Sequence, residues 1–509
     1  MAVRTTSTSS YWIDSQSLPR FRKLDRDLTV DVVVIGAGIT GLTTAYLLKR
    51  EGRTVAVLDR GRCGGVDTSY TSAHLTTVTD WRLSELVSTL GEDHARASWD
   101  AGFAAIARIE QCIKDEQIDC DFAWIPGYLH ADALRPATAD DVDNLQREAD
   151  TAAKLGFDAQ FVESVPFFDR PGVMYDGQAR MHPRKYLAAL ARAIDGDGSF
   201  IFDHSEAGEV EDDPPRVAVG SHTVTCGHLI VATHNPIVGI AGWLDATLLQ
   251  TALSLYSTYV VGGRVTHGSV PDALFWDTNQ PYRYVRIEPH RGFDYVIFGG
   301  EDHKTGQETD PGGCFDRLES ALRQVCPSVS VTHRWSGQVI ETNDGLPYIG
   351  EMAPHQFAAT GFAGNGLTFG TLAGMMAMDA ITGRENPWAG MFDIGRTKIR
   401  GGLWDYIREN KDYPYYLFRD RFAGAESRPL RSIARGEGTV VDVRGKPAAA
   451  YRRDDGKLVL LSPTCTHMGC FVRWNAADST WDCPCHGSRF KAEGGVLSGP
   501  AETPLKTLS

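Results

Sequence analysis

The sequence contains no long uninterrupted apolar run. A membrane-spanning helix needs about 20 such residues, and the most apolar stretch, 229–244, is interrupted by His234, Asn235 and Pro236. The first residues, Met-Ala-Val-Arg-Thr-Thr-Ser, also lack the apolar segment of a secretory signal. We therefore expect a chain with no membrane span and a cytoplasmic location.

An excess of positive charge is also missing. The 509 residues include 51 Lys and Arg against 65 Asp and Glu, which gives a net charge of −14. Because a negative protein repels polyanions, we expect no nucleic-acid partner. The hydrophobic share of 42% is that of a folded globular protein, and the length predicts two or three domains.

Cysteine shows little ligand-like spacing over most of the chain. Six of the ten cysteines are scattered, and we expect them to be reduced, packed thiols: Cys63, Cys112, Cys120, Cys226, Cys314 and Cys326. The other four lie in two boxes near the end, Cys465-Thr-His467-Met-Gly-Cys470 and Cys483-Pro-Cys485-His486-Gly-Ser488. Two thiolates on one iron and two imidazoles on the other hold a Rieske [2Fe–2S] centre, and the neutral imidazoles raise its potential. A zinc site is the alternative, because Zn²⁺ also binds Cys and His at short spacing.

The two boxes resemble the ligand boxes of Rieske proteins. The resemblance implies two cysteine and two histidine ligands: Cys465, His467, Cys483 and His486. It also implies a disulfide between Cys470 and Cys485 that braces the two loops. Phe490 departs from the respiratory members, which usually carry a Tyr there that hydrogen-bonds a ligand sulfur. The loss of that hydrogen bond predicts a lower reduction potential.

A nucleotide-binding pattern lies near the start of the chain. Residues 31–35 predict a buried parallel strand, followed by the loop Gly36-Ala-Gly38-Ile39-Thr40-Gly41, a helix to about residue 50 and a second strand, 54–58. The first glycine permits a tight turn, the second lets the backbone approach a pyrophosphate, and the third lets the helix pack on the strand. Asp59, followed by Arg60, is placed to accept hydrogen bonds from a ribose. The pattern predicts dinucleotide binding without separating FAD from NAD.

The rest of the chain favours FAD. No second strand–G-x-G-x-x-G–helix unit follows, so no separate pyridine-nucleotide domain is expected. Segments 335–337 and 344–350 precede Gly361-Phe-Ala-Gly364-Asn365-Gly366-Leu367-Thr368. Together they resemble the C-terminal flavin motif of the D-amino-acid oxidase, glycine oxidase and sarcosine oxidase superfamily. The resemblance implies a helix whose N-terminal amides stabilise the anionic reduced flavin.

The resemblance extends over most of the first 400 residues. Segments 11–12, 182–186, 230–234 and 299–306 look like those of a subgroup that joins an amine-oxidising flavoprotein to a C-terminal Rieske domain. It implies further FAD contacts: Ile39, Thr40, Thr71, Ser72, Ala73, His74, Val210, Ala232 and Thr233. Some relatives bond a His of the loop after the second strand covalently to the flavin. Thr71 occupies that position and His74 is offset from it, so we expect non-covalent FAD.

Two residues are candidates for catalysis. Lys304 lies in a segment that resembles the place where sarcosine-oxidase-like members keep a lysine near flavin N5, where a cation stabilises reduced flavin. Arg286 follows Tyr282 and Tyr284 on one face of a predicted strand and could clamp a substrate carboxylate. The alternatives are a solvated lysine after a turn and an ordinary ion pair within the sheet. Two histidines are further pocket candidates, with a structural role as the alternative: His182 and His303.

These patterns predict an α/β Rossmann-like FAD domain with a mixed-sheet substrate domain, as in D-amino-acid oxidase, plus an all-β C-terminal Rieske domain. The predicted boundaries are a discontinuous FAD domain (1–80, 161–250 and 341–384), a helical insertion (81–160), a substrate domain (251–340), a linker (385–430) and the Rieske domain (431–509).

The combination predicts a dehydrogenase. We expect FAD-dependent oxidation of a small amine or amino acid by hydride transfer to the flavin. Because the cluster accepts one electron at a time, the electrons leave in two single steps through it to an unidentified external acceptor. A simple oxidase reacts with O2 directly and needs no cluster. The sequence names neither the amine nor the acceptor.

Other functions share parts of this pattern. A Rieske oxygenase needs a third, mononuclear iron bound by two His and a carboxylate, and no such spacing occurs outside the two boxes. A ferredoxin reductase would need a second nucleotide fold. A non-catalytic redox sensor would bind FAD and report the cluster state to a partner without turning over any amine.

Overall fold

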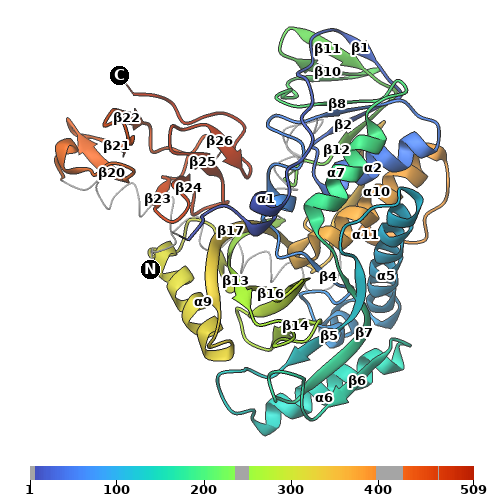
Figure 1. Cartoon of the computed structure of the whole chain (residues 1–509). Helices are drawn as coiled ribbons and strands as arrows, with labels where there is room; N and C mark the ends of the chain where they lie inside the picture. The colour runs from blue at the N-terminus through green and yellow to red at the C-terminus, as the bar shows by residue number, and fades with distance from the viewer. Residues whose placement is uncertain (1–5, 236–251, 397–427, 468, 509) are drawn as a thin grey trace.

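The computed structural model describes residues 6–235, 252–396, 428–467 and 469–508. A parallel sheet with its helices, a large mixed sheet and a C-terminal all-β part follow one another in space (Figure 1). The C-terminal part lies beside the mixed sheet, next to β17 and α9. The described residues contain no helix long and apolar enough to cross a membrane.

The parallel sheet is built on short strands of β-branched and small apolar residues. Both faces of β2 and β3 are buried, which is why their sequences are continuously apolar rather than alternating. The strand order is β18-β19-β12-β2-β3-β8, parallel except for the β18–β19 pair. The bounds are β2 (Val32–Ile35), β3 (Val55–Leu58), β8 (Phe200–Phe202), β12 (His228–Val231), β18 (Tyr348–Ala353) and β19 (Gln356–Thr360).

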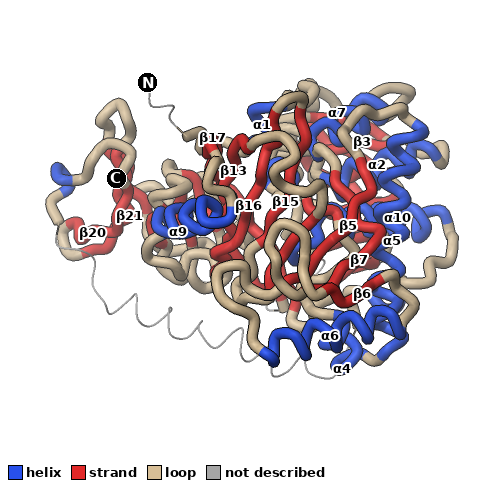
Figure 2. The backbone as a smooth tube through the Cα atoms, turned by 60° about the horizontal axis from the view of Figure 1, so that its bottom comes forward, coloured by secondary structure: helices blue, strands red, loops and turns tan. Residues whose placement is uncertain are grey.

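Helices cover this sheet, and a small sheet extends it. Helix α10 packs against both α2 and α5, and α2 also packs against α7; Figure 2 shows α2, α10 and α5 side by side. The helices of this layer are α1 (Tyr11–Ser15), α2 (Ile39–Arg50), α3 (Asp67–Tyr70), α7 (Pro183–Ile194), α10 (Gly366–Thr382), preceded by the short η1 (Ala363–Asn365), and α11 (Ala389–Phe392). The small sheet, in the order β1-β11-β10-β9, contains β1 (Leu28–Thr29), β9 (Val210–Asp212), β10 (Pro215–Val219) and β11 (His222–Thr225).

The mixed sheet draws on two separate stretches of chain. Its order is β17-β13-β16-β15-β14-β5-β7-β4, with β6 paired to β7. Its strands are β4 (His74–Leu75), β5 (Ala123–His130), β6 (Ala159–Val162), β7 (Gly172–Arg180), β13 (Leu253–Val265), β14 (Leu274–Asp277), β15 (Tyr284–His290), β16 (Phe293–Lys304) and β17 (Ser330–Thr342). The accompanying helices are α4 (Leu83–Leu90), α5 (Glu92–Asp115), α6 (Ala139–Lys154) and α9 (Pro311–Val325).

The predicted fold class is confirmed, but two segments of the chain contribute strands to the mixed sheet that the sequence had not assigned to it. Segment 81–160 is not purely helical, because β5 runs parallel to β14 inside the mixed sheet. Strands β6 and β7 also belong to that sheet rather than to the nucleotide-binding sheet. The long helices α5 and α6 dominate the sequence pattern here, and the pairing of β5 with β14 depends on contacts far apart in the chain. The predicted linker, 385–430, lies mostly outside the described residues.

The C-terminal part contains two antiparallel sheets. The first, β20-β21-β22, contains β20 (Gly438–Val443), β21 (Lys446–Arg452) and β22 (Leu458–Leu461), preceded by η2 (Leu430–Ser432). The second, β23-β24-β25-β26, contains β23 (Arg473–Asn475), β24 (Thr480–Asp482), β25 (Arg489–Lys491) and β26 (Val496–Ser498). The two cysteine–histidine boxes lie in the loops before β23 and after β24.

The turn between β2 and α2 yields a test of the fold. A Cβ on Gly41 would lie 1.9 Å from the carbonyl oxygen of Gly36, so Gly41→Ala must push the helix off the turn. Overpacking of this kind costs roughly 1–3 kcal/mol or more, and we expect at least that loss of unfolding free energy in urea titrations, together with lower FAD content. Gly390→Ala, in α11 with nothing within 4 Å of the added Cβ, is the matched control; equal stability of the two variants would contradict this reading.

Candidate functional site

A cavity of about 2090 Å³ opens where the carboxyl ends of β2, β3 and β12 face the mixed sheet. Ligands of open α/β sheets bind at this edge. The volume exceeds the roughly 300–1,000 Å³ of an ordinary ligand pocket, which leaves room for an extended cofactor and a substrate together. Its walls come from the parallel sheet, the mixed sheet and the C-terminal part.

The glycine loop forms one wall. Gly36 adopts φ +102, and a Cβ there would lie 2.4 Å from the Ala232 carbonyl oxygen, so only glycine fits. Gly38 caps α2, and the first residues of that helix line the cavity. The α2 N-terminus therefore presents its backbone N–H groups to an anionic ligand.

Asp59 anchors the next part of this wall. Its Oδ2 accepts the N–H of Ala37 at 3.0 Å and its Oδ1 accepts the N–H of Gly61 at 2.8 Å. Burial raises the pKa of Asp59, and these two hydrogen bonds oppose the rise. The acid thus holds the turn in shape while it faces the cavity. Arg60 also lines the cavity and donates a hydrogen bond to the carbonyl of Leu497, in the C-terminal part.

The opposite wall is formed by the 71–74 loop and the start of α10. Asn365 donates from Nδ2 to the carbonyls of Thr76 (3.1 Å) and Val78 (2.9 Å), and Thr368 donates to Thr76 at 2.8 Å. These bonds hold the α10 N-terminus against the loop. Thr71 lines the cavity on this side.

Most of the predicted cofactor residues meet at this cavity. Those that line it are Gly36, Gly38, Ile39, Thr40, Asp59, Arg60, Thr71, Ser72, His74, Val210, Ala232, Thr233, Gly364, Asn365, Gly366 and Leu367. The remaining predicted residues are outside the described lining: Gly41, Ala73, Gly361 and Thr368. Gly41 instead lets α2 pack on the turn, and Gly361, with φ +75, would place a Cβ 2.3 Å from Thr342. The individual contacts with FAD stay predictions.

The two predicted catalytic residues are elsewhere, which corrects the prediction. Arg286 is fully buried behind the cavity; it donates to the Ala73 carbonyl at 2.6 Å and pairs with Glu288. A guanidinium so engaged cannot clamp a substrate carboxylate, and it supports the 71–74 loop instead. Lys304 is the last residue of β16 and is not among the described cavity residues; its charge acts on His486, whose pKa it helps to lower. Lys304 therefore lies at the cluster loop.

The two pocket histidines have structural roles. His182 caps α7, where Nδ1 accepts the N–H of Lys185, and its Nε2 bonds Ser15 at 3.0 Å. His303 bonds the Tyr259 hydroxyl through Nε2 at 3.0 Å and the Lys304 carbonyl through Nδ1. Neither ring belongs to the described cavity wall.

The mixed sheet contributes polar residues that sequence reasoning missed. Tyr282 donates to Asp80 at 2.8 Å, and Asp80 also accepts the N–H of Gly364 at 2.7 Å. Thr258 and Tyr284 share a hydrogen bond of 3.0 Å across β13 and β15. No sequence pattern indicates a role for Asp80, and the pattern that includes Tyr282 and Tyr284 indicates only that they precede Arg286 on one face of a strand.

Asp302 is the other missed residue of this wall. Its Oδ1 is buried and has no hydrogen-bond partner among the described residues, and burial raises the pKa of its carboxyl to about 7. It lies within segment 299–306, which the sequence had singled out only by resemblance.

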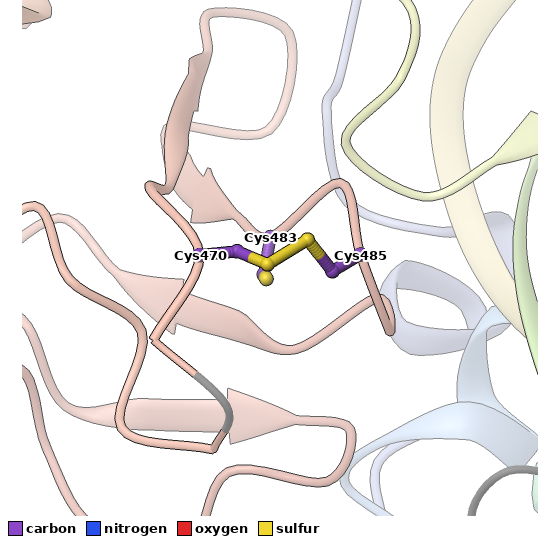
Figure 3. A group of neighbouring side chains, drawn as sticks. All are labelled: Cys470, Cys483 and Cys485. Carbon is purple, nitrogen blue, oxygen red and sulfur yellow. A yellow bond between two sulfur atoms is a disulfide. The ribbon is translucent and has the colours of Figure 1, made fainter. Parts of the chain in front are cut away.

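The two cysteine–histidine boxes converge in the C-terminal part. Each box is a tight turn closed by its own backbone, with the N–H of Cys465 bonded to the Cys470 carbonyl and that of Cys483 to the Ser488 carbonyl, both at 2.8 Å. Cys470 and Cys485 form a disulfide, with Cys483 beside it (Figure 3). The disulfide that the resemblance implied is therefore present.

The predicted ligands are close together and suited to a metal. The imidazoles of His467 and His486 lie 5.0 Å apart, and burial lowers the pKa of each to about 4, so both rings are neutral as ligands must be. The close approach of Cys465, together with burial, raises the pKa of Cys483. Two buried thiols in contact ionise together only when a cation neutralises them, which the irons of a cluster would do.

One segment of the C-terminal part belongs to both sites. Residues 495–499 and 501–504 line the cavity. The carbonyl of Thr503 accepts a 2.6 Å bond from the hydroxyl of Thr466, between the first two ligands, and the N–H of Ala501 donates to Ser488 in the second box. The cavity wall and the cluster loops are thus fastened to each other.

The residues of the cavity fit FAD, and those of the two boxes fit a [2Fe–2S] cluster. A glycine-lined cradle at a helix N-terminus suits a pyrophosphate, and a buried set of two thiols and two neutral imidazoles suits the mixed ligation of a [2Fe–2S] cluster. The fold and the two sites together define an FAD-dependent oxidoreductase that also carries a Rieske [2Fe–2S] domain.

Comparison with known proteins agrees with this class. The chain belongs to the DAO family of FAD dependent oxidoreductases, whose family model matches residues 31–380, and the Rieske [2Fe-2S] domain matches residues 426–509. The putative Rieske 2Fe-2S iron-sulfur protein YhfW of Bacillus subtilis (strain 168) is 31% identical over 98% of this chain and 97% of its own length. FAD and a Rieske cluster are therefore the cofactors of this protein.

Two further comparisons concern the flavin part. Gamma-glutamylputrescine oxidoreductase of Escherichia coli (strain K12) is 24% identical over 82% of this chain and 99% of its own length. The crystal structure of glycine oxidase from Geobacillus kaustophilus superposes with a TM-score of 0.57 at 19% identity, over 73% of this chain and all of that one. The second likeness concerns the fold alone.

The hydrogen bond from Thr466 to the Thr503 carbonyl, which connects the first box to the cavity wall, leads to a prediction. Thr466→Val keeps the shape of the side chain but removes its bond to the Thr503 carbonyl, worth about 1 kcal/mol. We expect the dissociation constant for FAD, measured by fluorescence quenching on the flavin-free protein, to rise roughly five-fold. Thr507→Val, an exposed threonine of the same domain, is the control. Iron analysis of each sample shows whether the cluster is intact, and unchanged FAD affinity with a full cluster would rule the coupling out.

Proposed function

We propose that this protein is a dehydrogenase of an amine or amino acid that passes electrons one at a time through its Rieske cluster to an external acceptor. FAD, when bound, supplies a hydride acceptor, and the cluster supplies a single-electron carrier. The chain's own residues orient the substrate, exclude water and connect the two sites. The family assignment supports the oxidoreductase class, and the likeness to gamma-glutamylputrescine oxidoreductase supports a nitrogen-bearing substrate. A cytoplasmic location stays part of this proposal.

The proposal rests mainly on segment 299–306, which runs from the cavity wall to the second cysteine–histidine box. Asp302, in its middle, lines the cavity, whereas Gly306, at its end, packs on the second ligand box. A Cβ on Gly306 would lie 2.7 Å from the backbone carbon of Cys483. The cavity wall and the ligand loop are therefore two ends of one short peptide.

A second connection runs through β17. Gln338 lines the cavity and donates from Nε2 to the carbonyl of Gly487 at 2.9 Å, directly after the ligand His486. The same amide donates to Thr305 at 3.2 Å. Further bonds hold the parts together, from Gln307 to the Pro484 carbonyl at 3.1 Å and from Ser336 to Asp478 at 2.6 Å. This packing supports direct electron transfer between the sites.

The proposal is tested by anaerobic reduction. A panel of amines and amino acids is screened for flavin bleaching without oxygen, and the cluster is followed by EPR in the same samples. We expect the EPR signal of the reduced cluster to appear with bleaching, in a ratio of two electrons per substrate oxidised. Bleaching that leaves the cluster oxidised would refute electron transfer within the protein, and a panel with no bleaching would refute the oxidation itself.

The Gln338 contact gives a sharper prediction. Gln338→Leu keeps the side-chain volume but removes the hydrogen bond to the ligand loop, worth about 1 kcal/mol. We expect cluster reduction after substrate mixing to slow several-fold in stopped-flow traces, while flavin reduction keeps its rate. The matched control is Gln160→Leu, on exposed β6 far along the same sheet. Equal slowing in both variants would mean that the contact has no role in transfer.

A further inference from the structure

Strand β16 carries a bulge at the point where it faces the cavity. Its register with β13 shifts between Ser257, opposite His303, and Tyr259, opposite Gly300. Two residues of β16, Glu301 and Asp302, thus stand opposite Thr258 alone, and Glu301 adopts φ +60, a conformation that non-glycine residues rarely take. Bulges redirect side chains beside functional sites, and such backbone strain concentrates there.

The neighbours on both sides hold this bulge in place. Glu301 turns outward to Arg317, with a 2.7 Å contact, and to Arg283. Gly299, two residues before the bulge, leaves room for the Tyr284 ring, which a Cβ there would meet at 2.1 Å. As a result Asp302 joins Tyr284 and Thr258 on the cavity wall.

The charges around Asp302 are those of a site for a cation. Of the described residues that the mixed sheet contributes to the cavity, none is Arg or Lys and the one His, His74, is kept neutral by burial, while three are carboxylates: Asp277, Asp302 and Glu341. Asp277 is occupied by the N–H groups of Asn279 and Arg283. Arg286, the arginine that the sequence suggested for a substrate carboxylate, is engaged behind the wall.

We propose that Asp302 is the receptor for the ammonium group of the substrate and takes its proton before oxidation, so that the natural substrate is an amine whose recognition needs no carboxylate. The inference rests on the proposed function, since it assigns the substrate class to the same cavity. In the step, one N–H bond of the ammonium breaks, the proton forms an O–H bond on Asp302, and the nitrogen keeps the electron pair. FAD, when bound, would supply the acceptor for the hydride of the neighbouring carbon, and the free electron pair would then be available for the C=N bond.

The electrostatics of the wall support this role. Burial is the main cause that raises the pKa of Asp302 to about 7; Asp80 and Glu301 add to the rise, and the hydrogen-bonding Thr258 hydroxyl opposes it. Of the other groups that face it, Tyr282 and Tyr284 have raised pKa values and stay neutral, and burial lowers the pKa of His74 to about 3, so that ring is neutral too. A carboxyl of this kind is anionic above pH 7 and suited to exchange a proton near neutrality.

The test uses tert-butylammonium, a cation with no hydrogen on the carbon beside nitrogen, so it binds without being oxidised. Its dissociation constant is measured calorimetrically on the full-length holoprotein between pH 6 and pH 9. An alkylammonium stays protonated over this range, so the affinity of the natural sequence should rise about ten-fold as Asp302 ionises through pH 7. In Asp302→Asn the affinity should be at least about ten-fold weaker at pH 8.5 and flat with pH.

Two further variants and one anion make the result decisive. Asp302→Glu keeps the carboxylate and should restore most of the affinity and its pH dependence. Asp143→Asn makes the same chemical change as Asp302→Asn on the exposed face of α6, outside the cavity, and should bind like the natural sequence. Pivalate, the carboxylate of the same shape, should bind more weakly than the cation. Visible spectra confirm FAD content in each sample.

Each outcome decides the inference independently of the proposed function. Equal cation binding by Asp302→Asn and the natural sequence, or tighter binding of pivalate than of tert-butylammonium, would overturn it. Substrate screening that finds no oxidised amine would refute the proposed function while the cation site still stands. Where an amine is found, Asp302→Asn should lower kcat/KM and remove its rise through pH 7.

Discussion

The contact between Gly306 and the backbone of Cys483 constrains the rest of the molecule. Gly306 adopts φ +79, and the space where a side chain would begin is filled by the ligand loop. Gly487, on the other side of this contact, would likewise place a Cβ 2.5 Å from Leu255. Two glycines that face each other across an interface let the cluster loop settle directly on strand ends that also border the cavity. A side chain at either glycine would therefore force the loop of the second box away from these strand ends.

The interface between the C-terminal part and the rest of the chain also bears on the role of the C-terminal part. If it were only an electron carrier, it could touch the flavin part anywhere near the cofactor. Instead it contributes residues 495–499 and 501–504 to the cavity and receives a hydrogen bond from Arg60, next to Asp59. Thr466 and Ser488 fasten that same segment to the two boxes, so the boxes are connected to the wall of the cavity. The two domains are therefore better regarded as one active unit than as two linked modules.

The sequence was most informative where chemistry depends on local spacing. The Gly36–Gly41 loop and both ligand boxes are short segments whose function follows from their own residues, so they could be predicted with correct strands, helix and disulfide. Arg286 and Lys304 were assigned from local patterns too, but their positions depend on distant partners. Glu288 and the Ala73 carbonyl engage Arg286, and the strand end of β16 carries Lys304 to the cluster loop. Strand β5 was missed for the same reason, since its partner β14 lies far away in the chain.

The bulge at Glu301 explains why the most informative acid of the cavity could not be located in advance. In a regular strand, residues alternate between faces, and any prediction for 299–306 would assign Asp302 and Lys304 to one side. The extra residue of this strand stands at Glu301 and Asp302; Asp302 faces the cavity, while Lys304, at the end of β16, acts on His486. An acidic residue of the cavity wall and a lysine that acts on the second box thus lie on the same short segment. The strained backbone at Glu301 is held by the contacts of its side chain with Arg317 and Arg283. Segment 299–306 also borders the cavity at Asp302 and packs on the loop of the second box at Gly306.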